Sequence, residues 1–230
     1  MAHLWQVLEL GIWIEKLAVK TMSGWILASG GNEFSSSYQQ ADLAALEKRT
    51  DKSSALLVVV TAPFPTQELA YKTAQKHFNS LGIKTLMSPI LSDKDLTTEN
   101  ISQLENSSAI YFAGGTPSRL VEAFIDTDAE AAIQNALLNG AVLMGSSAGA
   151  MLFGSRVVMP GGKDIGRGLN ILKNQIILAH FNKPWPSWVK QFTEQDFEIL
   201  GLSEGSSLLT TVTSATDTVT FGNISFLPPK

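Results

Sequence analysis

The stretch that decides the fold is Ala141-Val142-Leu143-Met144-Gly145-Ser146-Ser147-Ala148-Gly149-Ala150-Met151-Leu152-Phe153. Its first four residues are apolar without a break, which favours a strand buried on both faces of a parallel sheet. The pattern Gly-x-Ser-x-Gly follows, and the apolar residues after Gly149 favour the first turn of a helix. The stretch therefore predicts a strand–turn–helix elbow with Ser147 at its sharpest point.

The elbow gives Ser147 two properties that a nucleophile needs. Its hydroxyl would project above the carboxyl edge of the sheet, where ligands of α/β proteins bind. The helix that follows would aim free N–H groups at the same place. A Gly/Ser turn of this pattern is also common as a plain connection, so the functional hypothesis depends on partner groups elsewhere in the chain.

The segments before the elbow alternate between buried strands and helices. Apolar runs predict strands within 24–29, 55–62, 83–90 and 109–113, and helical patterns cover 35–48, 66–81, 96–104, 118–123 and 128–139. Such alternation predicts an α/β fold, a single-domain three-layer sandwich with a mostly parallel sheet. The Gly-Gly pairs at 30–31 and 114–115 fall at the carboxyl ends of strands, beside the elbow.

The segments after the elbow are shorter. We expect short strands near 156–159, 175–179, 198–202, 207–212 and 218–221 to complete the sheet, and a short helix over 186–194. No linker or repeat separates this part, so residues 24–230 are expected to form one domain. Residues 1–23 are apolar but carry two glutamates, and periodicity leaves open whether this extension is a helix or an added strand.

Composition excludes several functions. The chain of 230 residues has a formal net charge of −4 without a block of like charges, which argues against binding nucleic acid or a membrane surface. It has no cysteine, so disulfides, thiol nucleophiles and cysteine metal sites are excluded. No apolar run suits a signal peptide or a membrane span. We expect a cytoplasmic protein without a metal or another cofactor.

A serine nucleophile needs a base, usually a histidine, and the chain has three histidines. His3 lies in the N-terminal extension. His77 lies late in a predicted helix among polar residues, where we expect a solvated or helix-end histidine. His180 follows the apolar run 176–179, which places it at the end of a strand, and we therefore predict that it is the base.

The third member of a triad is a carboxylate that fixes the imidazole tautomer. Asp164 is the only carboxylate between Ser147 and His180, so it is the first choice, in a Gly-rich loop that also suits an ordinary turn aspartate. Three further carboxylates are alternatives: Glu194, Asp196 and Glu204. The oxyanion of acyl transfer needs N–H donors, for which Ala148 and the loop 114–116 are the candidates.

Together these motifs resemble the peptidase E (α-aspartyl dipeptidase) and cyanophycinase family of serine peptidases. The resemblance covers most of residues 24–212 and rests on the segments Gly30-Gly31, Ala109–Leu120, Gly145–Ala150, Gly168-Leu169 with His180-Phe181, and Gly201–Ser206. It implies a fold like that of class I glutamine amidotransferases. It also implies Ser147 as nucleophile, His180 as base and Gly115 with Ala148 as the oxyanion hole.

The chain departs from the family pattern at two places that bear on substrate. Thr116-Pro117 stands where the family often has Asn or Asp, and no arginine follows shortly after His180, as it does in cyanophycinases. We expect a small peptide as substrate, contacts to it from Thr116 and Glu204, and a homodimer. Two other functions stay open: an α/β-hydrolase esterase, and a catalytically degenerate domain that only binds.

Overall fold

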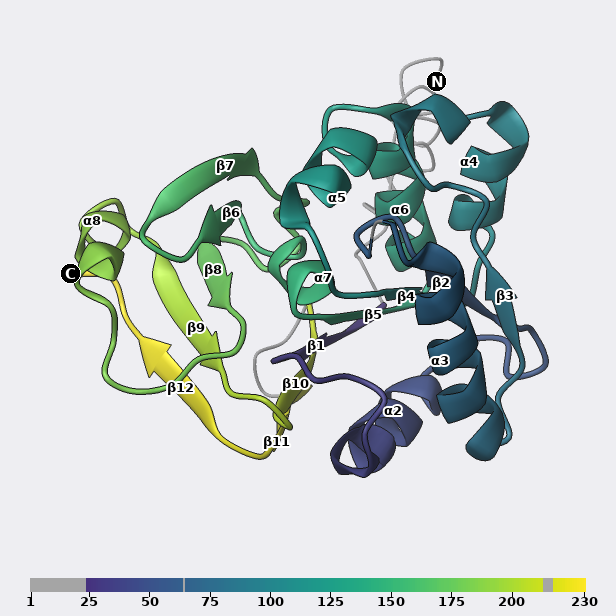
Figure 1. Ribbon diagram of the computed structural model, residues 1–230, viewed down its shortest axis with the longest axis horizontal. Coiled ribbons are helices and arrows are strands. Elements are labelled where there is room, and N and C mark those ends of the chain that lie inside the picture. Colours follow the sequence, from purple (N-terminus) through teal and green to yellow (C-terminus); the bar gives the residue numbers. More distant parts are fainter. Residues whose placement is uncertain (1–23, 64, 213–216) are drawn as a thin grey trace, which may run out of the picture.

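The computed structural model describes residues 24–63, 65–212 and 217–230 (Figure 1). The extension 1–23, on which the sequence left two possibilities, lies outside the described residues. Within the described part the strands form two sheets, with helices packed on both faces of the larger sheet. The α/β architecture predicted from the alternating pattern is confirmed.

The first sheet has seven strands in the order β11-β10-β1-β5-β4-β2-β3. Their bounds are Trp25–Ser29 (β1), Leu56–Val59 (β2), Thr85–Met87 (β3), Ala109–Phe112 (β4), Val142–Ser146 (β5), Ser207–Thr211 (β10) and Val219–Phe221 (β11). Strand β5 pairs in parallel with β1 on one side and with β4 on the other. The turn after β5 is therefore flanked by the loops that follow β1 and β4.

Helices cover this sheet on both faces. The α-helices are Gln39–Leu46 (α2), Gln67–Ser80 (α3), Thr98–Glu105 (α4), Pro117–Phe124 (α5), Asp128–Leu138 (α6), Ala148–Met151 (α7) and Lys190–Thr193 (α8), and the 3-10 turns are Ser36–Tyr38, Asp93–Asp95 and Ser187–Val189. Successive strand residues alternate between the faces: Leu143 packs with residues of α5 and α6, and Met144 with residues of α2 and α3. This alternation explains why the strands are apolar without interruption.

The later strands form a second sheet, which corrects the expectation that they complete the first. Its order is β12-β9-β8-β6-β7, with bounds Arg156–Met159 (β6), Lys163–Arg167 (β7), Gln175–Leu178 (β8), Glu198–Leu202 (β9) and Ile224–Leu227 (β12). Only β10 and β11 join the first sheet. The second sheet buries Ile177 and Leu200 in the main core, while Ile176 and Ile199 belong to a separate apolar cluster on its other side.

His77 lies in the last turn of α3, as one of the two expectations had it, and its burial corrects the other, a solvated side chain. Its Nε2 lies 2.7 Å from Oδ2 of Asp42, and both side chains are 4% exposed. The ring also contacts Phe34 and Phe78 edge to face or tilted. Burial raises the pKa of the Asp42 carboxyl, and the hydrogen bond to His77 opposes that rise. The pair joins α2 to α3 as a polar contact inside the core and lies apart from the elbow.

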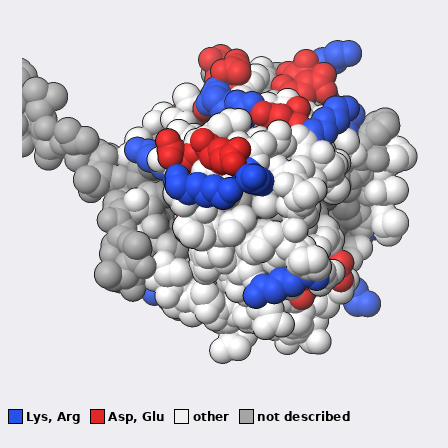
Figure 2. All heavy atoms as spheres, turned by 90° about the vertical axis from the view of Figure 1, so that its left-hand side faces the viewer, with Lys and Arg blue, Asp and Glu red and all other residues white. Residues whose placement is uncertain are grey.

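The charged side chains on the face in Figure 2 are mixed in sign. Lysines and arginines lie beside acidic residues on this face. The ion pairs of the described residues include Arg156–Asp164 and Lys190–Glu194. Such a face presents no extended field of one sign. None of the helices in the described ranges is long and apolar enough to cross a membrane.

Candidate active site

Ser147 occupies the strained turn that the elbow pattern predicts. It follows directly on β5 and has φ 51° and ψ −115°, a conformation that L-residues rarely adopt. Its N–H donates to the Ser29 carbonyl at 3.0 Å, which ties the turn to the end of β1. At Gly149 a Cβ would lie 2.0 Å from the Phe112 carbonyl oxygen, so only glycine lets helix α7 pack this closely on β4.

His180 reaches Ser147 from the second sheet. Its Nε2 lies 2.9 Å from the Ser147 Oγ, within hydrogen-bond distance. The backbone of His180 has φ 52°, and its N–H donates to the Gly30 carbonyl at 2.7 Å. A Cβ on Gly31 would lie 2.1 Å from the imidazole Cε1. The glycine therefore lets the ring pack directly against the loop after β1.

Glu204 completes a hydrogen-bonded chain with these two residues. Its Oε1 lies 2.8 Å from the His180 Nδ1, and both side chains are about half exposed. Strands β8 and β9 pair in parallel, and each ends two residues before the functional side chain, so the carboxyl ends bring His180 and Glu204 together. A carboxylate at Nδ1 accepts the Nδ1–H and leaves the Nε2 lone pair facing the serine.

Asp164 does not approach His180, and this corrects the first choice of carboxylate. It lies on β7, at the edge of the second sheet, and β7 forms a hairpin with β6. One oxygen of its carboxylate accepts from Arg156, and the other accepts the Gly166 N–H at 2.9 Å. Asp164 therefore shapes its hairpin, while Glu204, one of the alternatives, occupies the position beside the imidazole. Glu194 forms ion pairs with Lys190 and Lys230 instead.

The loop after β4 offers one unused N–H beside Ser147. The Gly114 N–H donates to Glu33 Oε1 at 3.0 Å, and the Thr116 N–H donates to the Ala62 carbonyl at 2.9 Å. Gly115 lies between them and has no hydrogen-bond partner for its N–H within the described ranges. It lines the same cavity as Ser147 and His180. The Ala148 N–H, at the first position of α7, is a second orphan donor.

A cavity of about 510 Å³ opens beside the Ser147–His180 pair. This volume falls in the range of small-molecule sites, roughly 300–1,000 Å³. Gly115 and Pro117 line it, whereas Thr116 and Glu204, which were expected to contact substrate, are outside its lining. Thr116 precedes helix α5, and Glu204 faces the imidazole.

Glu33 is a residue of this site that the sequence did not single out. Besides accepting the Gly114 N–H, its carboxylate accepts the Ser146 hydroxyl at 3.0 Å. It thus joins its own loop after β1 to the loop after β4 and to Ser146, the last residue of β5. Its position shortly after the Gly30-Gly31 pair, at the carboxyl edge of the sheet, was the available signal.

We expect Glu33→Ala to lower kcat by roughly 10²-fold, since small misplacements of reacting groups cost about that much. KM should change little, because Glu33 does not line the cavity. Glu33→Gln should retain much of the rate. The amide oxygen can accept the Gly114 N–H, and the amide NH₂ can donate to the Ser146 hydroxyl oxygen. Steady-state kinetics of the two variants test this, and equal losses in both would argue against a positioning role.

Tyr38 supports the opposite side of the site. Its hydroxyl donates to the Gly31 carbonyl and accepts the Gly205 N–H, the latter at 2.7 Å. Tyr38 thereby binds both Gly31, against which the imidazole packs, and Gly205, the residue after Glu204. Burial raises the pKa of Tyr38 to about 12, so the hydroxyl stays protonated as a donor at ordinary pH.

Tyr38→Phe should reduce kcat by roughly 5- to 15-fold, the equivalent of one hydrogen bond of about 1–1.5 kcal/mol.

The raised pKa of Tyr38 also predicts how stability depends on pH. The folded state holds the Tyr38 proton more tightly than the unfolded state. This difference in proton affinity contributes to the free energy of unfolding fully below pH 10, and the contribution is lost as pH rises toward 12. Denaturant titrations should show a shallower alkaline decline for Tyr38→Phe, and an unchanged decline would contradict the assignment.

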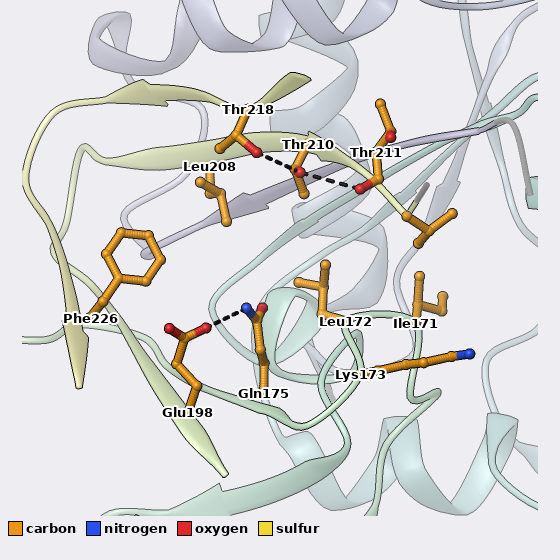
Figure 3. A pocket seen from close by; sticks show the side chains of 11 residues that line it. Ile171, Leu172, Lys173, Gln175, Glu198, Leu208, Thr210, Thr211, Thr218 and Phe226 are labelled. Atoms are coloured by element: carbon orange, nitrogen blue, oxygen red, sulfur yellow. Dashed lines mark hydrogen bonds between the residues drawn. The ribbon is translucent and has the colours of Figure 1, made fainter. Parts of the chain in front are cut away.

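A second cavity, of about 520 Å³, lies elsewhere (Figure 3). Its lining comes from β10 and Thr218, just before β11, from the segment 171–173 that precedes β8, and from β8, β9 and β12. Two pairs of its polar side chains bond each other, Gln175 with Glu198 at 2.6 Å and Thr210 with Thr218 at 2.9 Å. Within the described residues, the Oε1 of Gln175 is buried without a hydrogen-bond partner. No serine or histidine of the described ranges lines it.

The sequence model of peptidase family S51 matches residues 25–217, most of the chain. The chain belongs to this family of serine-type peptidases. The resemblance to the peptidase E family seen in the motifs is thereby confirmed. No match is found among curated proteins.

Two solved structures share the S51 fold. One is a peptidase from an acI-B1 actinobacterium, with a TM-score of 0.70 and 21% identity over 90% of this chain and 88% of that one. The other, provisionally described as peptidase E, is from Listeria monocytogenes EGD-e. Its TM-score is 0.58, with 15% identity over 89% of this chain and 98% of that one. They confirm the expected fold, like that of class I glutamine amidotransferases.

No group of three or more histidine, aspartate or glutamate side chains within residues 24–63, 65–212 and 217–230 is arranged to hold a metal ion. The polar groups at the cavity include the Ser147 hydroxyl, the His180 imidazole with the Glu204 carboxylate behind it, the Asn182 amide and backbone N–H groups. This set is suited to acyl transfer through a serine.

Proposed function

We propose that this S51 peptidase cleaves a peptide bond in a small peptide through an acyl-enzyme on Ser147. The observation that carries the proposal is the chain of hydrogen bonds from the Ser147 Oγ through His180 to Glu204, at 2.9 Å and 2.8 Å. It lies at the mouth of a cavity of suitable size. These residues have the geometry of a nucleophile, a base and an orienting carboxylate.

In the first half of the reaction, Ser147 attacks the scissile carbonyl carbon and His180 Nε2 accepts the hydroxyl proton. The Glu204 carboxylate stabilises the imidazolium that forms. The carbonyl oxygen becomes an oxyanion, which the N–H groups of Gly115 and Ala148 bind. His180 then gives its proton to the leaving amine, and the peptide bond breaks to leave an ester on Ser147.

In the second half, water replaces the amine. His180 takes a proton from the water, the hydroxide attacks the ester carbonyl, and the same oxyanion donors act again. Collapse of the tetrahedral intermediate returns the proton to Ser147 and releases the carboxylic acid. The proposal thus needs only groups of this chain and water.

His180→Gln should reduce cleavage of a peptide mixture by roughly 10⁴- to 10⁶-fold, because the base and the nucleophile act as one unit. Product formation followed by mass spectrometry is the measurement. His77→Gln is the matched control for catalysis, since His77 pairs with Asp42 in the core and does not line the cavity beside Ser147. Full activity in His180→Gln would refute the proposal.

The two alternative functions make different predictions. An esterase would hydrolyse short acyl esters and leave matched amides intact, and family membership favours the amides. A domain that only binds would leave Ser147 unreactive toward fluorophosphonates. The homodimer and the cytoplasmic location stay predictions.

A further inference from the structure

The cavity beside Ser147 is apolar on most of its wall. Six large side chains make that wall: Met151, Val158, Met159, Leu178, Phe181 and Trp188. They come from α7, from the end of β6, from the end of β8 and from the segment that leads into α8. Among the described residues, the polar side chains of the lining are those of Ser147, His180 and Asn182.

The wall is fixed in place next to the nucleophile. Met151 lies one helical turn after Ser147, and its N–H donates to the Ser147 carbonyl at 3.0 Å. Trp188 packs edge to face on Phe192 and under the β6–β7 hairpin, where a Cβ on Gly162 would lie 2.9 Å from the Trp188 Cβ. Phe181 stacks on Trp185 with centroids 4.2 Å apart. An apolar surface therefore begins where the scissile bond must lie.

No lysine or arginine lines this cavity in the described part of the chain. Two arginines of the surrounding elements have other partners: Arg156 binds Asp164, and Arg119 donates to the carbonyls of Thr61 and Leu91. The one titratable group of the lining, His180, must be neutral to act as base. A carboxylate side chain of a substrate would therefore lose its hydration here without gaining a cation, which is strongly unfavourable.

We propose that this enzyme prefers an uncharged apolar side chain, such as that of leucine, methionine or phenylalanine, next to the scissile bond, and that it discriminates against aspartate there. The inference rests on the proposed function, because it places that side chain in the cavity beside Ser147. Burial against the methionines and Trp188 supplies the preference. Met159 and Trp188 are the specificity-determining residues.

The first test compares peptides that differ at one position. Two dipeptide series, Xaa-Ala and Ala-Xaa, should be assayed with Xaa as leucine, phenylalanine, asparagine and aspartate. We expect kcat/KM for leucine or phenylalanine to exceed that for aspartate by about 10- to 100-fold in at least one series. Equal values, or a preference for aspartate in both series, would overturn the inference while leaving the peptidase function intact.

The second test separates the two proposals, because it does not need turnover. Two diphenyl phosphonates, one with an isobutyl and one with a carboxymethyl side chain, should be compared for their rates of reaction with Ser147. Faster labelling by the isobutyl probe supports the inference even if no dipeptide is cleaved. Faster labelling by the carboxymethyl probe overturns it. Failure of both probes to label Ser147 would contradict the proposed function and the inference together.

A substitution tests the role of Met159. Met159→Lys places a cation in the wall, so we expect it to lower kcat/KM for the leucine peptide and to raise that for the aspartate peptide, each by about tenfold or more. Leu86→Lys is the matched control, because Leu86 is 47% exposed on β3 at the far edge of the first sheet. An unchanged ratio in Met159→Lys, with the fold retained by circular dichroism, would overturn the assignment.

Discussion

Replacing Ser147 with alanine is expected to reduce peptide hydrolysis by roughly 10⁴- to 10⁶-fold. Alanine keeps the Cβ and removes only the hydroxyl group, whose oxygen would form the ester bond of the acyl-enzyme. The fold should survive, since the Ser147 N–H still donates to Ser29 and the helix after it is unchanged. Hydrolysis rates together with the thermal midpoint of unfolding measure both parts of this prediction.

Ser146→Ala is the control for this variant. The Ser146 hydroxyl donates to Glu33, so its loss should weaken the tie between the loops and cost at most roughly 10²-fold in kcat. Fluorophosphonate labelling should persist in Ser146→Ala and vanish in Ser147→Ala. The reverse pattern would show that the nucleophile had been assigned to the wrong serine of the elbow.

Replacing Glu204 with glutamine is expected to reduce kcat by roughly 10²- to 10⁴-fold with a small change in KM. A glutamine amide can donate to the His180 Nδ1, which favours the tautomer with its proton on Nε2. That nitrogen would then face Ser147 as a donor and could not accept the serine proton. The half-exposed position of the pair places the expected loss toward the lower end of the range.

Asp164→Asn is the matched control, and it should stay within a few-fold of the parent. Asp164 accepts hydrogen bonds from Arg156 and from the Gly166 N–H of its own hairpin. The asparagine amide should therefore alter the hairpin without changing the hydrogen bonds of the His180 imidazole. Both variants should be assayed on one peptide at one pH. A large loss in Asp164→Asn with a mild effect in Glu204→Gln would return the role to Asp164.

The elbow could be predicted from sequence because each of its requirements is local. A four-residue apolar run, small residues at 145 and 149 and an apolar helix start leave few other conformations. His180 was also predictable, because it directly follows the apolar run of β8. Both predictions depend on the rule that polar groups at the carboxyl ends of parallel strands meet at one edge.

The sequence favoured Asp164, whereas the structure has Glu204 beside His180, because the choice relied on sequence order and could not use strand pairing. Asp164 is nearer to both partners in the chain, yet β7 lies at the outer edge of the second sheet. Glu204 is 24 residues from His180, yet β9 is the parallel neighbour of β8. The existence of a second sheet, and so of that pairing, is a long-range property that no periodicity within a strand encodes.

Glu33 and His77 illustrate the same distinction. Glu33 acts through a backbone N–H of one loop and a hydroxyl of another, and neither contact has a sequence signature. His77 has polar sequence neighbours, but its helix face turns toward the Asp42 carboxylate in the core. The burial of a polar side chain depends on the partner that the fold supplies.

The most direct test of the account is the site and rate of fluorophosphonate labelling, mapped by mass spectrometry of proteolytic fragments. The account predicts a single adduct on Ser147, formed rapidly in the parent and in Asp164→Asn, and greatly slowed in His180→Gln and Glu204→Gln. An adduct on another serine, or labelling of Ser147 at the parent rate in His180→Gln, would contradict the claim that Ser147, His180 and Glu204 form the catalytic unit.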